Sequence, residues 1–358
     1  MTNTTYRTAV VGLTGIGARR APVVSGGLRR PMGRSHVSCY VEHPRTELVG
    51  VCDLRAEALD EFREMWPDLP DVAIHTDFAT LLAEQQPDIV SVVTGDHVHA
   101  GLTVAAAEAG ARAIFCEKPI ATTLEDADRM IEACEREGVL LSVDHTRRWS
   151  ASHSEAQRMV ASGALGAVRT VAVEHYGPRA MMFRNGTHMI DLLCFFAGAE
   201  PRWVTAQLEP GFDHFDRYRG DGGKDPAQDP YATALIGFED DIRGIYSGYK
   251  TEFNAGILSI TCERGRVEFY NEHGRILTSD GTGMHRELRA ADLVPGDYLY
   301  VTQLAAVDEL VAALDAGSGT LVSPGTDARW TLEILLGVLA SQQNGHNRVD
   351  LPLPRSGN

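Results

Sequence analysis

The stretch Ala113-Ile114-Phe115-Cys116-Glu117-Lys118-Pro119-Ile120 decides the fold. Its apolar first half, residues 113–116, is typical of a short buried strand. Pro119 removes a backbone donor and disfavours helical backbone at the preceding residue, so the strand ends and the chain turns at Lys118. In an open α/β sheet, ligands bind at the carboxyl ends of the strands. Lys118 is therefore either aimed at a ligand or solvated in an ordinary loop, and this stretch alone leaves both interpretations open.

Similar apolar stretches lie on both sides of it in the first part of the chain. Further strands are predicted at residues 8–12, 48–53, 87–94 and 139–143. Helical patterns are found between and around them, at residues 56–65, 78–85, 100–109 and 124–137. Five strands that alternate with helices predict a parallel, doubly wound sheet, and this α/β domain is expected to span residues 1–147.

The first predicted strand runs directly into a series of glycines: Gly12, Gly15 and Gly17. A strand followed by glycines and then a helix is typical of a dinucleotide-binding turn. Thr14 stands where a strict GxGxxG pattern needs glycine, so a glycine-rich turn without a ligand remains an alternative. Residues 18–32 show no amphipathic helical pattern and predict an insertion, with Gly33 at or near the helix start.

The second predicted strand ends in Asp53, which lies 20 positions after Gly33. At this spacing an acid meets the adenosine ribose hydroxyls of a bound dinucleotide. The distance from Gly12 is 41 positions, too long without an insertion. The spacing therefore supports both the insertion and the site, and a carboxylate there favours NAD over NADP. Arg55 weakens that preference, because it can turn toward a 2′-phosphate.

The remaining residues, 148–358, have a different pattern that predicts an α+β domain. Strands are predicted at residues 168–176, 202–209, 231–238, 242–249, 256–262 and 266–271. Their alternation and the turn at Glu239-Asp240-Asp241 predict an open, mainly antiparallel sheet. Residues 209–230 are rich in Gly, Asp and Pro, which predicts a mobile surface loop. Helices are predicted at 154–162, 188–197, 300–316 and 326–343, and the last two are expected to dock on the sheet or on the first domain.

Composition and charge exclude several classes of protein. The 358 residues carry a formal net charge of −16, which argues against general affinity for nucleic acid or anionic membranes. The N-terminus shows no apolar signal core, and no stretch has 18 consecutive apolar residues. The six cysteines are scattered without a CxxC pair or zinc spacing, so no metal site is predicted and a reducing cytoplasm is the expected location.

Four motifs make the sequence resemble the Gfo/Idh/MocA family of oxidoreductases over nearly its whole length. They are Cys116-Glu117-Lys118-Pro119, Val93-Thr94-Gly95-Asp96-His97-Val98-His99, Asn185-Gly186-Thr187-His188-Met189-Ile190-Asp191, and the tail from Thr326 to Leu353. The resemblance implies an N-terminal Rossmann domain, a C-terminal open sheet often used for oligomerisation, and a nicotinamide dinucleotide. It also implies a small-molecule substrate of the sugar or cyclitol class, and a homodimer or homotetramer formed through the C-terminal sheet.

By the same resemblance, Lys118 is similar to the family's active-site lysine and His188 to its catalytic histidine. Asp191 lies one helical turn after His188, where it can orient the imidazole or simply solvate the helix. Many dehydrogenases of this family carry an aspartate four residues before the histidine, and here that residue is Arg184. This departure puts a conventional proton relay in doubt and hints at a substrate with an acidic or crowded group, because arginine binds carboxylates bidentately.

The predicted sites follow from these motifs. The expected cofactor-binding residues are Gly12, Thr14, Gly15, Ile16, Gly33, Asp53, Thr94, His97, His99, Glu117 and Lys118. The expected substrate-binding residues are Lys118, Arg147, Arg148, Arg184 and His188. Simple solvation remains an alternative for His97 and His99, as surface charge does for Arg147 and Arg148.

Histidine titrates near neutrality and suits a base for a hydroxyl proton, while a lysine ammonium stabilises the developing alkoxide. The sequence therefore predicts an NAD(P)-dependent oxidoreductase that moves a hydride between nicotinamide and a secondary hydroxyl of a sugar, cyclitol or glycoside. Two alternatives stay open. One is a non-redox enzyme that cleaves or eliminates after a transient oxidation by bound NAD, and the other is a dinucleotide-sensing regulatory protein.

Overall fold

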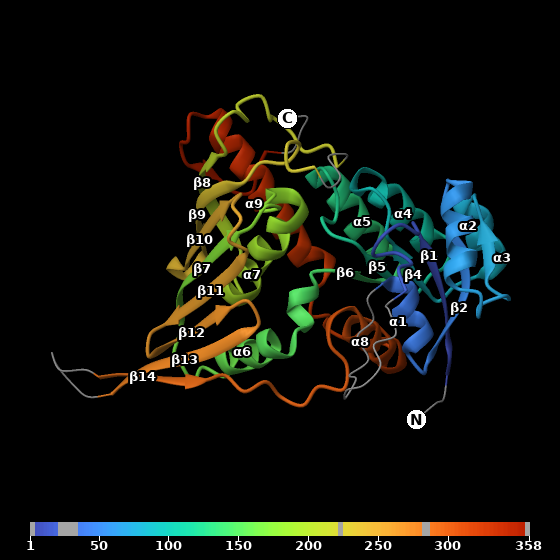
Figure 1. The fold of residues 1–358 in the computed structure, drawn as a ribbon, viewed down its shortest axis with the longest axis horizontal. Coiled ribbons are helices and arrows are strands. Elements are labelled where there is room, and N and C mark those ends of the chain that lie inside the picture. Colours follow the sequence, from blue (N-terminus) through green and yellow to red (C-terminus); the bar gives the residue numbers. More distant parts are fainter. Residues whose placement is uncertain (1–3, 21–34, 221–224, 281–286, 355–358) are drawn as a thin grey trace. The chain divides into compact units, whose positions relative to one another are not determined.

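A six-stranded parallel sheet forms the centre of the first of two units, which consists of residues 1–149 and 298–328. The computed structural model describes residues 4–20, 35–220, 225–280 and 287–354. In sheet order the strands are β3 (Ala73–His75), β2 (Thr46–Cys52), β1 (Tyr6–Val11), β4 (Ile89–Val92), β5 (Ala113–Cys116) and β6 (Leu140–Val143). The order reverses between β1 and β4, as in a doubly wound Rossmann sheet, which confirms the predicted fold class (Figure 1).

Helices connect these strands and cover the sheet. They are α1 (His36–Glu42), α2 (Ala56–Met65), α3 (Phe78–Gln85), α4 (His99–Glu108) and α5 (Leu124–Glu137), with short 3-10 turns η1 (Asp96–Val98) and η2 (Thr146–Trp149). Local sequence explains their ends. The Thr123 hydroxyl accepts the Asp126 N–H at 3.1 Å and caps α5, and Gly138 with a φ of 68° ends it.

A helix from late in the sequence, α8 (Thr302–Ala316), completes the first unit. Leu304, Val307 and Leu310 are fully buried and share one hydrophobic core with residues of the parallel sheet such as Val10 and Phe115. Burial of a large aliphatic side chain contributes roughly 1.5–3 kcal/mol. The apolar face of α8 is therefore a substantial part of this core.

The second unit consists of residues 150–297 and 329–358 and contains a nine-stranded sheet. In sheet order the strands are β14 (Glu287–Asp292), β13 (His273–Asp280), β12 (Gly265–Tyr270), β11 (Ala255–Cys262), β7 (Val168–Tyr176), β10 (Arg243–Tyr249), β9 (Ala232–Phe238), β8 (Pro201–Leu208) and β15 (Val349–Asp350). Neighbours are antiparallel except β7 and β10, which run parallel. This confirms the open, mainly antiparallel sheet.

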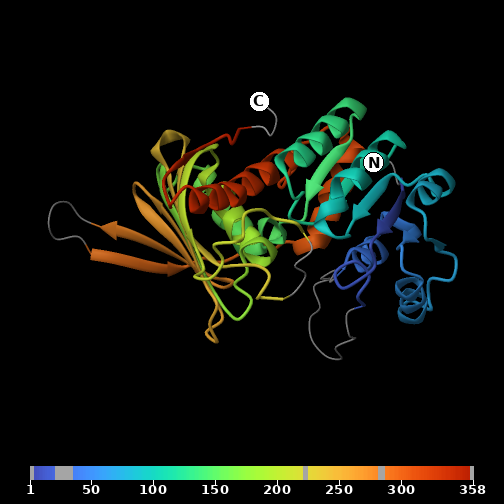
Figure 2. The same ribbon diagram turned by 90° about the horizontal axis from the view of Figure 1, so that it is seen from above.

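One face of this sheet is covered by helices (Figures 1 and 2). They include α7 (Thr187–Ala197), which follows a π-helical turn η3 (Met182–Gly186), and α9 (Gly325–Gln343); α6 (Ala151–Ala161) precedes β7. Ile190 and Leu193 of α7 and Leu335 of α9 are fully buried in the core that includes the sheet side chains Val171 and Ile236. Along β9 and β10, buried positions are interleaved with more exposed ones. This is expected for strands in which helices cover one face of the sheet and leave the opposite face uncovered.

Four strands were absent from the sequence prediction: β3, β13, β14 and β15. Two of them are too short to show a period, with three and two residues. Every residue of β14 is exposed, so this strand carries no apolar alternation. Edge strands held by backbone hydrogen bonds alone leave no hydrophobic signal in a sequence.

Among the helices of the described residues, none combines the length and the apolar character that crossing a membrane requires.

Candidate active site

The glycine turn after β1 requires glycine for steric reasons. A Cβ on Gly12, whose φ is 93°, would lie 2.4 Å from the carbonyl oxygen of Val93, which follows β4. A Cβ on Gly17 would lie 2.1 Å from the carbonyl oxygen of Gly12. Gly15 also has a positive φ of 57°, but a Cβ there would meet nothing within 4 Å. The turn is therefore closely packed underneath and open at Gly15, as expected where a backbone approaches a ligand.

The predicted insertion is bridged by backbone hydrogen bonds. The N–H of His36 donates to the carbonyl of Ile16, and that of Val37 to the carbonyl of Gly17, both at 3.0 Å. The glycine turn thus continues into α1, while Thr14 and Ile16 are exposed at its surface. The predicted helix-start residue Gly33 and most of the insertion at 18–32 lie outside the described residues.

Asp53 follows β2 and is brought against the glycine turn. One carboxylate oxygen, Oδ2, accepts the N–H of Leu13 at 3.0 Å, and the other, Oδ1, accepts the N–H of Arg55 at 3.0 Å. The side chain of Asp53 is largely buried, and the Arg55 guanidinium lies 3.4 Å from Oδ1. Two backbone donors therefore fix the Asp53 side chain at the edge of the turn.

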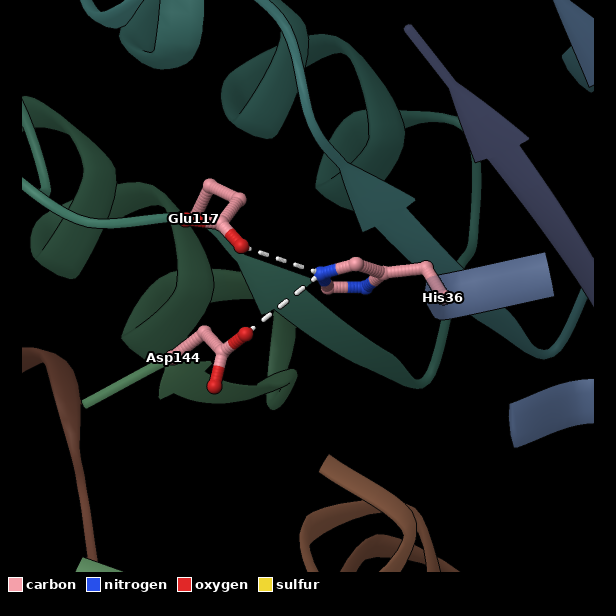
Figure 3. Close-up of side chains that lie close together, drawn as sticks. All are labelled: His36, Glu117 and Asp144. Atoms are coloured by element: carbon pink, nitrogen blue, oxygen red, sulfur yellow. Dashed lines mark hydrogen bonds and ion pairs between the residues drawn. The ribbon is translucent and has the colours of Figure 1, made fainter. Parts of the chain in front are cut away.

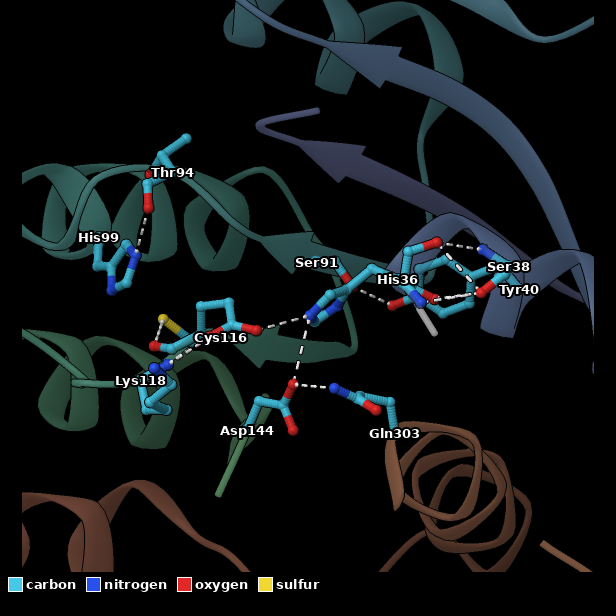
Figure 4. Close-up of polar contacts among 12 residues, drawn as sticks. His36, Ser38, Tyr40, Ser91, Thr94, His99, Cys116, Lys118, Asp144 and Gln303 are labelled. Carbon is cyan, nitrogen blue, oxygen red and sulfur yellow. Dashed lines mark hydrogen bonds and ion pairs between the residues drawn. The ribbon is translucent and has the colours of Figure 1, made fainter. Parts of the chain in front are cut away.

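The residues after β4 are tied to those after β5 by His99. Its imidazole is fully buried, with Nδ1 3.1 Å from the carbonyl oxygen of Pro119 and Nε2 3.3 Å from that of Thr94 (Figure 4). His97, on η1, is exposed. Both histidines were predicted to bind the cofactor; the structure places His99 as a buried link between two turns and His97 at the surface.

Lys118 lies at the carboxyl end of β5 and is half-buried. Its backbone N–H donates to Oε2 of Glu117 at 3.2 Å, and the peptide bond between Lys118 and Pro119 is cis. Because β5 is the strand next to β4 in the sheet, Lys118 and Thr94 both follow strands that end at the same edge. This is the edge at which ligands bind in open α/β sheets.

Beside Lys118, three side chains form a buried cluster that the sequence analysis missed. It consists of His36, Glu117 and Asp144, and is called here the His36 cluster. Figure 3 shows the imidazole between the two carboxylates, with His36 Nε2 3.4 Å from Glu117 Oε1 and 3.6 Å from Asp144 Oδ2. The only hint in the sequence was that Glu117 and Asp144 each follow a predicted strand, so both lie at the same sheet edge.

Neutral polar groups extend the His36 cluster on both sides (Figure 4). Nδ1 of His36 lies 2.8 Å from Ser91 Oγ, which lies 2.7 Å from the hydroxyl of Tyr40. Nε2 of Gln303, on α8, donates to Asp144 Oδ2 at 3.2 Å. The imidazole is therefore held from both ring nitrogens, and its orientation is fixed.

The pKa shifts within the His36 cluster follow from burial and from the charges that face one another. Burial lowers the pKa of His36, but the hydrogen bonds and charges of Asp144 and Glu117 outweigh it and raise the pKa to about 9. Burial raises the pKa of Glu117, but the hydrogen bond from His36 and the charges of Lys118 and His36 more than reverse this and lower the pKa to about 2. Burial and the Glu117 charge raise the pKa of Asp144 to about 6. At neutral pH the cluster therefore holds an imidazolium beside ionised Glu117.

The same three side chains are also the ones that could supply metal ligands. Among the described residues, they form a group of His and acidic side chains whose ligand atoms all lie within 4.8 Å of one another. A proton on His36 Nε2 that is shared between the two carboxylates accounts for these distances without a metal ion. The absence of a metal therefore stays a prediction.

In the second unit, the predicted catalytic histidine lies at the start of α7. His188 is the second residue of this helix and is half-buried, directly after the π-helical turn η3. Asp191, one turn further along, is fully buried, and its Oδ1 accepts a hydrogen bond from the Thr331 hydroxyl on α9 at 3.3 Å. Single π-turns of this kind occur frequently at functional sites.

Arg184 lies within η3, and its backbone is anchored from a distant loop. Asp229, which is buried, accepts the backbone N–H groups of Phe183 at 3.1 Å and Arg184 at 2.8 Å. Burial raises the pKa of Asp229 to about 6, although these two N–H groups act in the opposite direction. The segment that leads into α7 is therefore held by one carboxylate.

Two arginines that were predicted to bind substrate lie in the first unit. Arg148 is 1% exposed, and its guanidinium donates to Asp327 Oδ2 and to the carbonyl of Val322, both at 2.7 Å. This burial places Arg148 in the framework of the unit. Arg147 is half-buried beside it on η2.

Comparison with known proteins places these features in a family. A model of an oxidoreductase family with an NAD-binding Rossmann fold matches residues 6–145, and a model of the Gfo/Idh/MocA C-terminal domain matches residues 153–276. D-apiose dehydrogenase of Paraburkholderia graminis is 31% identical over 188 residues, which cover 48% of this chain and 49% of that protein. Inositol 2-dehydrogenase 2 of Saccharopolyspora erythraea is 30% identical over 179 residues, with 46% and 52% covered. The chain spans about half the length of these curated relatives.

A solved structure agrees with the fold over the whole chain. Levoglucosan dehydrogenase in complex with NADH and L-sorbose has a TM-score of 0.77 at 18% identity, and the match covers 98% of this chain and 99% of that one. The two family models together match both units, from the glycine turn to the antiparallel sheet. The protein therefore belongs to the Gfo/Idh/MocA family of oxidoreductases, whose N-terminal domain is an NAD-binding Rossmann fold.

Proposed function

We propose that the protein is an NAD-dependent oxidoreductase that transfers a hydride between a nicotinamide cofactor and a secondary hydroxyl of a sugar, cyclitol or glycoside. The observation that carries the proposal is the position of Lys118. It is half-buried at the carboxyl end of β5, next to Glu117, whose carboxylate is held by His36. The matched dehydrogenases of apiose and inositol support this substrate class. The first unit is assigned to the cofactor and the second to the substrate.

The glycine turn and Asp53 fit a dinucleotide. Gly12 and Gly17 admit no side chain, Gly15 faces open space, and Asp53 is held at the turn by the N–H of Leu13. The turn would approach the pyrophosphate, and Asp53 would accept hydrogen bonds from the adenosine ribose. Bound NAD⁺ supplies the acceptor for the hydride.

Lys118 and His188 act on the substrate hydroxyl. His188 takes the O–H proton as a neutral imidazole, and the Lys118 ammonium stabilises the developing alkoxide while the C–H hydride leaves and the carbonyl forms. Glu117 positions Lys118 by accepting its backbone N–H. Asp191, buried against Thr331, fixes the first turn of α7 and with it the helix that carries His188.

The test is a panel of sugars, cyclitols and glycosides with NAD⁺, followed by NADH absorbance. We expect stoichiometric NADH with one substrate class, a fall in kcat of about 10²- to 10⁴-fold for His188→Ala, and a fall at least as large for Lys118→Ala. The double variant should lose less than the product of the two losses. Titration with NAD⁺ controls for folding. Turnover without NADH would instead favour the transient-oxidation mechanism, and no turnover with any sugar would contradict the proposal.

We also propose that NAD is preferred to NADP. The Asp53 carboxylate accepts hydrogen bonds from both ribose hydroxyls and repels a 2′-phosphate. Hydrogen bonds to charged groups contribute about 1.5–3 kcal/mol, so NAD should bind at least about tenfold more tightly. Dissociation constants for both cofactors measure this, and tighter binding of NADP would contradict it. Asp53→Asn should narrow the difference.

The second unit's open sheet suggests a homodimer or homotetramer. Leu235 on β9 and Ile245 on β10 are cross-strand partners, and 38% and 40% of their surfaces are exposed. Such an uncovered apolar pair is typical of a face that another copy covers. We propose that copies associate through this face. Light scattering of the wild type and of Ile245→Glu tests it: the variant should dissociate, and a monomeric wild type would contradict the proposal.

A further inference from the structure

Within the second unit, one pocket is not explained by the transfer of hydride alone. It has a volume of about 210 Å³ and lies between η3 and the long loop that joins β8 to β9. The ionisable residues of its lining are Arg184, His214, Arg217, Arg219 and Asp229. Three guanidinium groups and a histidine therefore face one carboxylate, in a chain whose net charge is −16.

The one acidic residue of this lining is already engaged. Asp229 accepts hydrogen bonds from the backbone N–H groups of Phe183 and Arg184, so both of its carboxylate oxygens are used to hold the backbone. The other acids among the described residues of the loop, Glu209, Asp213, Asp216 and Asp225, do not line the pocket, and Asp213 accepts a hydrogen bond from Gln342. Among the described residues, neither Arg217 nor Arg219 forms an ion pair, and both are exposed.

The wall of the pocket is aromatic and well ordered by contacts. The ring of Tyr218 stacks on that of Phe183, with centroids 3.9 Å apart and planes at 3°. Phe215 packs 6.1 Å from Phe183 between centroids. Lys250 holds the loop by donating to Glu209 and to the carbonyl of Pro226, both at 2.5 Å. Aromatic faces beside guanidinium groups suit a sugar ring that carries a negative charge.

The pocket shares one residue, Arg184, with the segment that leads to the proposed base. Arg184 lines it from η3, and His188 follows one turn later on α7. Both segments belong to the same unit and the same run of chain. A group bound against Arg184 would therefore lie next to the helix end that carries the proposed base.

We propose that this arginine pocket binds an anionic group of the substrate, so that the enzyme acts on charged sugars in preference to neutral ones. The inference rests on the proposed oxidoreductase function and names its substrate class. Guanidinium groups bind both carboxylates and phosphates in bidentate fashion, so the charge belongs either to a sugar acid or to a phosphorylated or nucleotide-linked sugar. The shared chemistry is an oxyanion held by Arg217, Arg219 and Arg184.

The test compares kcat/KM for three probes, glucuronate, glucose 6-phosphate and UDP-glucose, with that for glucose. Wild-type protein should prefer at least one anionic probe by tenfold or more, and that probe identifies the source of the charge. The double variant Arg217→Ala/Arg219→Ala should lower the ratio of anionic to neutral kcat/KM by about tenfold, mainly through KM. Added salt should weaken the preference in the wild type and much less in the variant. Arg243→Ala, a surface arginine of the same unit, is the matched control.

Calorimetry separates this inference from the proposed function. Binding of the preferred anionic probe to the full-length protein should be lost or weakened at least tenfold in Arg217→Glu/Arg219→Glu, while NAD binding is kept as the control for folding. An unchanged ratio and unchanged binding would overturn the pocket assignment and leave the oxidoreductase function standing. Anion binding that depends on these arginines, without turnover of any sugar, would support the pocket and overturn the catalytic proposal.

Discussion

The His36 cluster of the first unit and the arginine pocket of the second both gather charged side chains, but they differ in burial. The side chains of His36, Glu117 and Asp144 are 0%, 12% and 1% exposed, and the imidazole of His36 faces both carboxylates. Arg217 and Arg219 are exposed on a loop and share a pocket with one acid. Substitution of a buried, paired charge lowers the stability of the fold. An exposed charge on a loop can be substituted with little loss of stability, so such a loop can be adapted to bind a different ligand.

This contrast agrees with a division of labour between the two units. Under the proposed function the first unit binds the cofactor, and the His36 cluster holds the sheet edge at which that cofactor would bind. Under the same proposal the second unit binds the substrate, and the exposed loop that carries Arg217 and Arg219 forms the wall that would contact it. Substitutions in the cluster should therefore act on stability, and substitutions in the pocket should act on affinity.

The largest expected effect comes from breaking the cluster. His36→Leu leaves two buried carboxylates without their cation, and loss of one partner of a buried ion pair typically costs about 3–5 kcal/mol. Chemical denaturation measures the free energy of unfolding. Asp144→Asn in the same chain should restore part of it, because one of the two repelling charges is then gone. A His36→Leu variant as stable as the wild type would show that the cluster is not charged.

The second expected effect is a dependence of stability on pH. The folded pKa of His36 is raised from 6.5 to about 9, so its contribution is complete below pH 6.5 and is lost as the pH rises through 9. At 1.36 kcal/mol per unit this amounts to about 3 kcal/mol. Melting temperatures between pH 6.5 and 9 should fall in the wild type and much less in His36→Leu. Equal slopes in both proteins would assign the effect to other groups.

A smaller loss of stability is expected from substitution of Asp229, the buried acid in the lining of the arginine pocket. Asp229→Asn keeps one acceptor but turns an amide toward one of the two backbone N–H groups of Phe183 and Arg184. A buried donor left unsatisfied costs about 1–3 kcal/mol. Because Asp229 anchors the segment before His188, KM for the preferred sugar should rise together with this modest loss. If stability falls while KM is unchanged, Asp229 supports the fold only.

The smallest effect is expected from removal of metal. A proton on His36 accounts for the geometry of the cluster, so treatment with a chelator should change neither melting temperature nor turnover. Metal analysis of the untreated protein gives the matching measurement. A stoichiometric divalent ion, or a chelator-dependent loss of stability, would show that His36, Glu117 and Asp144 are metal ligands.

The sequence predicted the parts of the fold that bury apolar residues with a clear period. Helix α5, strand β7 and the turn of β9 into β10 were all predicted at or near their observed bounds. The edge strands β3 and β14 were not, because hydrogen bonds to one neighbour require no particular side chains.

Residues of the candidate site could be predicted only where they belong to a local sequence motif. Lys118 and Glu117 stand out beside Pro119, but nothing in the sequence pairs His36 with Glu117 and Asp144, which lie about 80 and 110 positions away. Arg148 was placed near the sheet edge by its position after a strand, and its burial against Asp327 depended on a segment from late in the chain. Contacts between distant segments leave no local pattern.

The place of α8 in the first unit has a consequence for how the chain folds during synthesis. The core of the parallel sheet includes Leu304, Val307 and Leu310, and Gln303 bonds to Asp144 beside the imidazole of His36. A nascent chain that has just released residue 149 from the ribosome therefore exposes an apolar surface with no helix to cover it. Residues 150–297 must be synthesised before α8 emerges. The core of the first unit can therefore be completed only after most of the chain has left the ribosome.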